Sequence, residues 1–317
     1  MFMKTTDVLR CAGAAIAIFL VASWVPFFRP LISLLTSLLF LYFASKSGRL
    51  QGILIVAFSL LIISAIAGLL ARTDIIFLFV ESGLIGLVLA ELFRHELSFG
   101  HTMLWGTIAL LAFEVLVLYL FSPSGDASPL ELFLETGRAR IKAFFAIFEK
   151  TESAALNDQQ AQIMIKIFEQ IYPALLVMGT AFVIWINIVF SKIFFLRIGL
   201  KYPDFGALDQ WFAPLSMVWI TIAAGFASFF AAGSIKFLAI NLIVIFAAIY
   251  TWQGLMIMMC FFNKYRISIW LVSGICLLIF FQGYLLLVLT LAGLFDQWID
   301  FRKLRQPAVK NPEDDFE

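Results

Sequence analysis

The sequence predicts an all-α fold: a polytopic transmembrane helical bundle of nine or ten spans, with ten preferred, and an amphipathic outer interfacial insertion. Of its 317 residues, 62% are hydrophobic and 14% are charged, and the mean hydropathy is +0.99. Soluble domains average about 45–50% apolar and about 25% charged residues, so this chain has too few polar residues to cover a surface in water. The apolar runs lack the alternation of a membrane β-barrel, which leaves helices as the spanning elements.

Nine apolar segments predict the spans, because a helix needs about 20 residues to cross the hydrocarbon core. The first resembles a signal peptide, but no A-x-A-like site precedes Trp24, so we predict an uncleaved span. The last, 266–298, is long for one span and short for two, and Gln282-Gly283 favours a tight turn in its middle. The segments are 8–25, 30–45, 50–71, 75–93, 103–121, 172–192, 212–231, 236–262 and 266–298.

The distribution of Lys and Arg predicts the orientation. With ten spans and a cytoplasmic N-terminus, fourteen Lys and Arg residues lie in cytoplasmic segments and three, Arg29, Arg72 and Lys236, lie in short outer loops. With nine spans the division becomes ten against seven. The positive-inside rule therefore favours ten spans in a multi-pass membrane protein with both termini in the cytoplasm.

The stretch 122–171 differs from the spans. Ser128 can cap a helix, Pro129 suits its first position and Glu131 completes a capping box. Arg138 and Lys142 fall off the apolar stripe that follows, as in an amphipathic helix over 129–150. The stripe comprises Leu130, Phe133, Leu134, Gly137, Ile141, Phe144, Phe145 and Phe148.

A second amphipathic helix is predicted around Ile163, Ile167 and Ile171. The insertion fits either a helix on the membrane surface or an outer lid or partner-docking arm. The predicted division is a first transmembrane group 1–121, an extracytoplasmic insertion 122–171, a second transmembrane group 172–303 and a disordered cytoplasmic tail 304–317.

Two glutamates are set in apolar spans. Glu81 and Glu114 each stand roughly 10 Å from the outer end of consecutive antiparallel helices, so they share one level. A carboxylate facing lipid costs several kcal/mol, so we expect both to face the bundle interior. Together they are candidate ligands for a small solute or a cation, or a protonation switch. The alternative is that each is neutral and hydrogen-bonds a neighbouring helix.

Three further polar groups lie in the span 236–262: Asn241, Tyr250 and Gln253. Isolated amides in membranes commonly join helices, and an aromatic ring with a polar tip can also stack on a flat solute. All three are candidate ligand-binding residues.

Small residues recur at four-residue spacing in two spans. Ser82, Gly86 and Ala90 lie beside Glu81, and Gly13 and Ala17 lie in the first span. Such stripes let helices approach closely, within one bundle or against a partner subunit, and they are candidate packing or docking surfaces.

Enzymatic and metal-binding patterns are weak. The three cysteines lie in apolar segments without a CxxC pair, and His95 and His101 stand in a short loop without a cysteine nearby, so we predict no metal site. No nucleophile–base constellation or nucleotide-binding loop occurs. The net charge of +1 and the lack of a basic stripe exclude a nucleic-acid partner. We expect no catalytic residues, no cofactor and no enzymatic activity.

Three places carry a resemblance. They are Asn241 with Tyr-Thr-Trp-Gln-Gly at 250–254, Gly-Leu-Phe-Asp at 293–296 with Asp-Phe-Arg at 300–302, and the turn from Pro26 to Pro30. Over most of the chain the sequence resembles the YybS-like bacterial membrane proteins, a family of unknown function. That family is distantly similar to the S components of energy-coupling factor transporters, which bind solute near the outer face and dock a transmembrane partner through small-residue faces.

Two hypotheses follow for the function. The first is a solute-binding transporter subunit of the S-component kind, whose partners are the lipid bilayer, a membrane subunit and a small solute or cation. The alternative is a structural or assembly protein that docks partner subunits through its small-residue helix faces.

Overall fold

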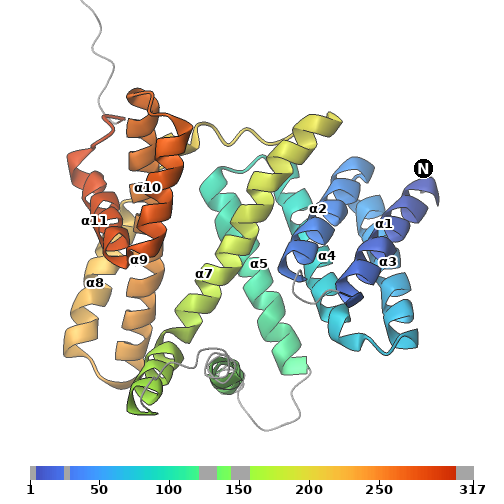
Figure 1. Ribbon diagram of the computed structural model, residues 1–317, viewed down its shortest axis with the longest axis horizontal. Helices are drawn as coiled ribbons and strands as arrows, with labels where there is room; N and C mark the ends of the chain where they lie inside the picture. Colours follow the sequence, from blue (N-terminus) through green and yellow to red (C-terminus); the bar gives the residue numbers. More distant parts are fainter. Residues whose placement is uncertain (1–4, 25–28, 121–133, 144–157, 305–317) are drawn as a thin grey trace, which may run out of the picture. The chain divides into compact units, whose positions relative to one another are not determined.

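The computed structural model describes residues 5–24, 29–120, 134–143 and 158–304, and within these ranges the regular structure is entirely helical (Figure 1). The chain divides into two compact units. Unit 1 comprises Met1–Glu152 and Leu176–Phe205, and unit 2 comprises Ser153–Leu175 and Gly206–Glu317.

Unit 1 is built from antiparallel helices joined by short turns. The turn between α2 and α3 is sharp because Gly48 adopts a φ of +81°, which a residue with a side chain rarely does. The helices are α1 (Thr5–Trp24), α2 (Arg29–Ser47), α3 (Arg49–Leu69), the 3₁₀ turn η2 (Thr73–Ile75), α4 (Ile76–Arg94), α5 (Phe99–Leu120), a helix at 134–143, and α7 (Asp158–Ile198) from Leu176 onward.

The core of unit 1 combines large apolar side chains with close backbone approaches. Phe19, Phe40 and Phe79 are fully buried. A Cβ placed on Gly86 of α4 would lie 2.7 Å from the Leu41 backbone nitrogen of α2, nearer than real Cβ contacts come. The packing of α4 on α2 therefore requires glycine at this crossing.

Unit 2 has its closest approach between α9 and α11. A Cβ on Gly254 would lie 2.1 Å from the Leu289 carbonyl oxygen, and one on Gly293 would lie 2.0 Å from the Tyr250 carbonyl oxygen. The elements are the first part of α7, the 3₁₀ turn η3 (Leu208–Gln210), α8 (Ser216–Phe230), α9 (Gly233–Lys264), α10 (Ile269–Phe281) and α11 (Gly283–Ile299).

Six helices in the described part of the chain are long and apolar enough to cross a membrane. A seventh span results if α10 and α11, which are bent by 105°, form one broken span. The predicted break within 266–298 is confirmed at Gln282, but ten spans are not confirmed, since α8 has only 15 residues and α10 only 13. The six are Thr6–Trp24, Arg49–Leu69, Ile76–Arg94, Phe99–Leu120, Gln162–Ile198 and Gly233–Lys264.

The predicted insertion is described in part. Over 134–143 the chain is helical, with Gly137 and Ile141 buried and Arg138 and Lys142 exposed. The second predicted helix forms the start of α7, which continues through the predicted boundary at 171/172 to Ile198. The helix cap at Ser128, the aromatic residues Phe144, Phe145 and Phe148, and the tail from 305 lie outside the described residues.

Candidate functional site

The two glutamates of unit 1 lie on neighbouring helices. The rings of Phe77 on α4 and Phe113 on α5 stack with their centroids 6.3 Å apart. Glu81 follows Phe77 by one helical turn, and Glu114 directly follows Phe113. Glu81 stands five residues from the start of α4 and Glu114 six from the end of α5, which is roughly 8–9 Å in each case.

Both glutamates are half-buried, and the same cationic side chain lies near both. Glu81 lies within electrostatic range of Glu114, and both lie within range of Arg140 on the helix 134–143. Among the described residues, neither carboxylate has a hydrogen-bond partner. No sequence signal pointed to Arg140, because its local pattern does not indicate which span the insertion approaches.

Asn241 of α9 forms hydrogen bonds with the backbone of α7 at the turn that contains Pro173. Pro173 lacks the N–H that an interior helical residue donates, and its ring disturbs the preceding turn. The Ala174 N–H donates to Asn241 Oδ1 at 2.9 Å, and Asn241 Nδ2 donates to the Gln170 carbonyl at 2.9 Å. The amide thus joins α9 to α7 from a buried position.

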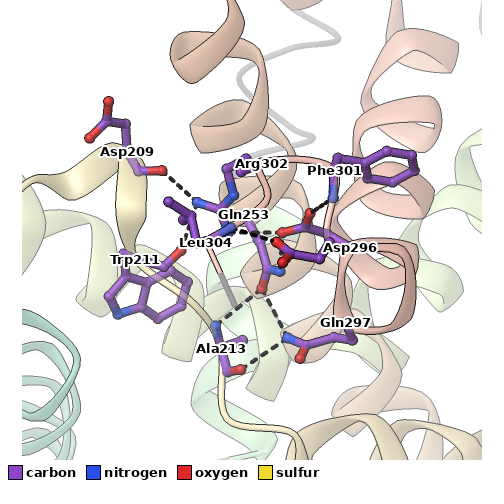
Figure 2. Close-up of polar contacts among 10 residues, drawn as sticks. Asp209, Trp211, Ala213, Gln253, Asp296, Gln297, Phe301, Arg302 and Leu304 are labelled. Atoms are coloured by element: carbon purple, nitrogen blue, oxygen red, sulfur yellow. Dashed lines mark hydrogen bonds and ion pairs between the residues drawn. The ribbon is translucent and has the colours of Figure 1, made fainter. Parts of the chain in front are cut away.

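Gln253 belongs to a buried polar cluster between the interior of α9 and the C-terminal end of α11, shown in Figure 2. Its Nε2 donates to Asp296 Oδ2 at 3.1 Å. Its Oε1 accepts from the Ala213 N–H at 3.1 Å and from Gln297 Nε2 at 3.2 Å. Gln297 Nε2 also donates to the Ala213 carbonyl at 2.9 Å, so two side-chain amides hold both backbone groups of one residue.

Arg302 completes this cluster (Figure 2). Its NH2 donates to Asp296 Oδ2 at 2.8 Å, and both side chains of this ion pair are fully buried. Its NH1 donates to the carbonyls of Asp209 and Trp211, and its guanidinium lies 4.1 Å from the centre of the Phe212 ring. The guanidinium therefore ties the segment before α8 to the carboxylate of α11.

The segment after α11 turns back to the cluster through a tight turn. Asp300 ends α11 in the left-handed conformation, with a φ of 47°, which aspartate tolerates better than most residues. The Phe301 N–H donates to Asp296 Oδ1 at 2.9 Å. This turn folds Arg302 back onto the end of α11.

Tyr250 lies one turn before Gln253, and its ring is covered by protein. It is 1% exposed and packs in a core with Ala213, Val218 and Phe246. Tyr250 and Gln253 thus lie together in the interior of α9. Asn241 stands nine residues before Tyr250 on the same helix, and Glu81 and Glu114 belong to unit 1.

Sequence reasoning missed several members of the polar cluster. Asp296 and Arg302 fall within the short motifs Gly-Leu-Phe-Asp and Asp-Phe-Arg, which carried a resemblance but no role. No sequence pattern pointed to Asp209, Trp211 or Gln297. Asp209 and Trp211 contribute only backbone carbonyls to the cluster, which a side-chain pattern cannot reveal.

The small-residue stripes have different environments. Ser82, Gly86 and Ala90 are buried, and the hydroxyls of Ser33 on α2 and Ser82 on α4 lie 3.1 Å apart. In contrast, Gly13 and Ala17 of α1 are exposed, and a Cβ on Gly13 would meet nothing within 4 Å. The first stripe packs inside unit 1, and the second lies on its surface.

Metal-ligating side chains do not gather in the described part of the chain, where no group of three or more His, Cys, Asp or Glu residues could hold an ion. Cys11, Cys260 and Cys276 are free thiols.

Comparison with known families identifies one match. A family model described as "Predicted membrane protein (DUF2232)" matches residues 13–297. No curated protein and no solved structure matches the chain.

Proposed function

The chain belongs to the DUF2232 family of predicted membrane proteins, and from this premise we propose that it is a non-enzymatic, solute-binding subunit of the bacterial inner membrane. Its site is formed by Glu81 and Glu114, and it takes a small cation or a solute with an ammonium group. One observation supports the proposal: two half-buried carboxylates lie within electrostatic range of each other, with no hydrogen-bond partner among the described residues.

The chemistry of such a pair favours a cationic ligand. Two neighbouring carboxylates in an apolar bundle repel each other and lose hydration, so their ionised forms are costly. A bound cation offsets both costs, because it supplies the charge and the coordination or hydrogen bonds that the helices do not. Arg140 lies within range of both carboxylates and moderates this cost when no ligand is bound.

The proposed role resembles that of an S component, which binds solute near the outer membrane face and relies on a partner for energy. Both carboxylates lie near one end of unit 1, and we take that end as the outer one because the predicted cytoplasmic connections hold the excess of Lys and Arg. The proposed orientation has both termini in the cytoplasm.

Thermal unfolding of the purified chain in lipid nanodiscs tests the site. A ligand that binds the folded state raises the unfolding temperature by mass action. The probes are Na⁺, K⁺, Ca²⁺ and methylammonium as chlorides at equal ionic strength. At least one should stabilise the wild-type chain, and Glu81→Gln and Glu114→Gln should each abolish that shift while Glu135→Gln, an exposed control, keeps it.

Two results would overturn the proposal. One is that no probe stabilises the wild-type chain, and the other is that the shift survives in both glutamine variants. Unfolding temperatures without added probe separate a lost site from a lost fold, because a binding residue can be changed to its isosteric amide with little effect on the apo protein.

A second candidate function is docking of a membrane partner through Gly13 and Ala17. The observation favouring it is that both are exposed on α1, with open space where a Gly13 side chain would lie. Gly13→Leu should remove a partner that co-purifies in mild detergent, whereas Gly179→Leu should not, since Gly179 is likewise exposed with nothing within 4 Å of a Cβ. Equal recovery of partners with both variants would exclude this surface.

A further inference from the structure

The chain passes between the two units at two places that the structure describes. The first lies between Leu175 and Leu176 inside α7, and the second lies between Phe205 and Gly206 in the connection from α7 to α8. Each place is bordered by specific contacts that belong to one unit.

The first crossing follows the weakened turn of α7. At Pro173 one helical hydrogen bond is absent, and the Ala174 N–H and Gln170 carbonyl are bonded to Asn241. Bending of helices concentrates where proline or an inserted side chain interrupts the backbone ladder. Asn241 also donates to the Phe237 carbonyl of its own helix at 2.9 Å, so α9 holds α7 up to Ala174.

On the unit 1 side, the second crossing is held by an aromatic cluster. The Tyr202 hydroxyl donates to the Ile188 carbonyl at 3.0 Å. The Tyr202 ring meets those of Phe93 and Phe205 edge to face, with centroids 5.5 and 5.4 Å apart, and Phe205 meets Phe99 at 6.0 Å. Burial raises the pKa of Tyr202, so its hydroxyl stays a donor at neutral pH. The chain is therefore fixed to unit 1 through Phe205.

On the unit 2 side, the segment before α8 is held through its backbone. Arg302 binds the carbonyls of Asp209 and Trp211, and the two glutamines bind both backbone groups of Ala213 (Figure 2). Backbone groups cannot be moved by rotating a side chain, so this clamp fixes the path of the chain from Asp209 onward.

Between these anchors lies Gly206–Leu208, where Gly206 has a φ of +66°. We propose that the protein contains a two-point hinge, in which the units move relative to each other about residues 174–176 and Gly206–Leu208. Asn241 and Gln253, both on α9, hold the unit 2 ends of the two connections. Gly206–Leu208 lies in a connection, where a few residues can absorb the change in backbone angles. Residues 174–176 lie inside α7 next to Pro173, where the interrupted backbone ladder allows the helix to bend.

The position of the anchors explains why α9 carries two buried amides. Asn241 bonds Ala174 beside the first crossing, and Gln253 bonds Ala213 in the segment that leads from the second crossing to α8. A hinge needs fixed borders, because a joint whose neighbours also move spreads the motion over many residues. The hinge does not depend on the identity of any solute or on the glutamate site.

Pulsed electron spin resonance distances on the full chain in nanodiscs test the hinge. In a variant lacking the three native cysteines, Leu50→Cys and Lys264→Cys place one label on each unit at exposed positions. The pair should show a broad distance distribution that Pro173→Ala narrows, because alanine restores the missing N–H of α7. A pair within unit 1, Leu50→Cys with Lys192→Cys, should be narrow in both backgrounds.

A narrow distribution between the units that Pro173→Ala leaves unchanged would overturn the hinge, as would an equally broad distribution within unit 1. Hydrogen exchange tests the anchors separately. Asn241→Leu should remove the protection of amides at 170–176 alone, and Arg302→Gln that of 209–213 alone. If neither variant changes exchange at its own segment, the anchors do not hold these connections and the proposal fails.

Discussion

Replacing Arg302 with methionine tests how strongly the buried ion pair joins the segment before α8 to α11. The guanidinium and the Asp296 carboxylate are both fully buried. Methionine keeps an apolar side chain beside Phe212. Among the described residues, Asp296 then keeps only the donors Gln253 Nε2 and the Phe301 N–H. Removing one partner of a buried ion pair costs about 3–5 kcal/mol, because the remaining charge is uncompensated.

The expected loss converts into a measurable change of unfolding temperature. For units of 150–250 residues, 1 kcal/mol shifts the midpoint by roughly 2–4 °C, so Arg302→Met should lower it by roughly 6–20 °C. Differential scanning fluorimetry in detergent reports this change through tryptophan emission, and Trp211 lies beside the cluster. Lys303→Gln is the matched control, since Lys303 is exposed and adjacent in the chain.

A double variant separates the stability that comes from the Arg302–Asp296 ion pair from the stability that comes from packing of the two side chains. Arg302→Met with Asp296→Leu removes both charges, so its loss should be clearly smaller than the sum of the two single losses. Two results would refute the reasoning. Either Arg302→Met behaves like Lys303→Gln, or the double variant loses the full sum of the single variants, which would mean that the two side chains act independently.

Three other substitutions test packing. Asn241→Leu should cost about 1–3 kcal/mol, because two backbone groups of α7 lose their partner, and thermal unfolding measures it. Gly293→Val should cost more than the about 1–3 kcal/mol of ordinary overpacking, since its Cβ meets backbone atoms, while Gly274→Val, with open space, should be tolerated. Gly86→Leu should prevent α4 from packing on α2 and lower the yield of folded protein, whereas Gly68→Leu should not; equal yields would contradict the close approach.

The helical class could be predicted from composition because an apolar excess of this size admits few other structures in lipid. The break at Gln282 was also predictable, since a polar residue followed by glycine interrupts a long apolar run. The number of spans could not be settled in this way. Hydropathy marks apolar runs but not where a helix begins and ends within them, and α8 and α10 have only 15 and 13 residues.

The positions of Glu81 near the start of α4 and of Glu114 near the end of α5 could be predicted, because they follow from helix length and antiparallel order alone. Helix rotation and the placement of Arg140 could not, since each depends on packing between segments distant in the sequence. The roles of Asn241 and Gln253 were hidden for the same reason. An amide in a span has the same local pattern whether it binds a solute or, as here, the backbone of another segment.

The glycines of the short motifs explain why the polar cluster can form at all. Gly254 follows Gln253 in α9, and Gly293 precedes Asp296 by less than one turn in α11. The absence of side chains at these two positions lets the helix backbones touch, which brings the short side chains of Gln253 and Asp296 to 3.1 Å. A larger residue at either glycine would separate the helices and break this hydrogen bond. Gly293→Val should therefore also release the clamp on Ala213, and hydrogen exchange at 209–213 would detect that loss; unchanged protection there would show that the clamp is independent of the helix crossing.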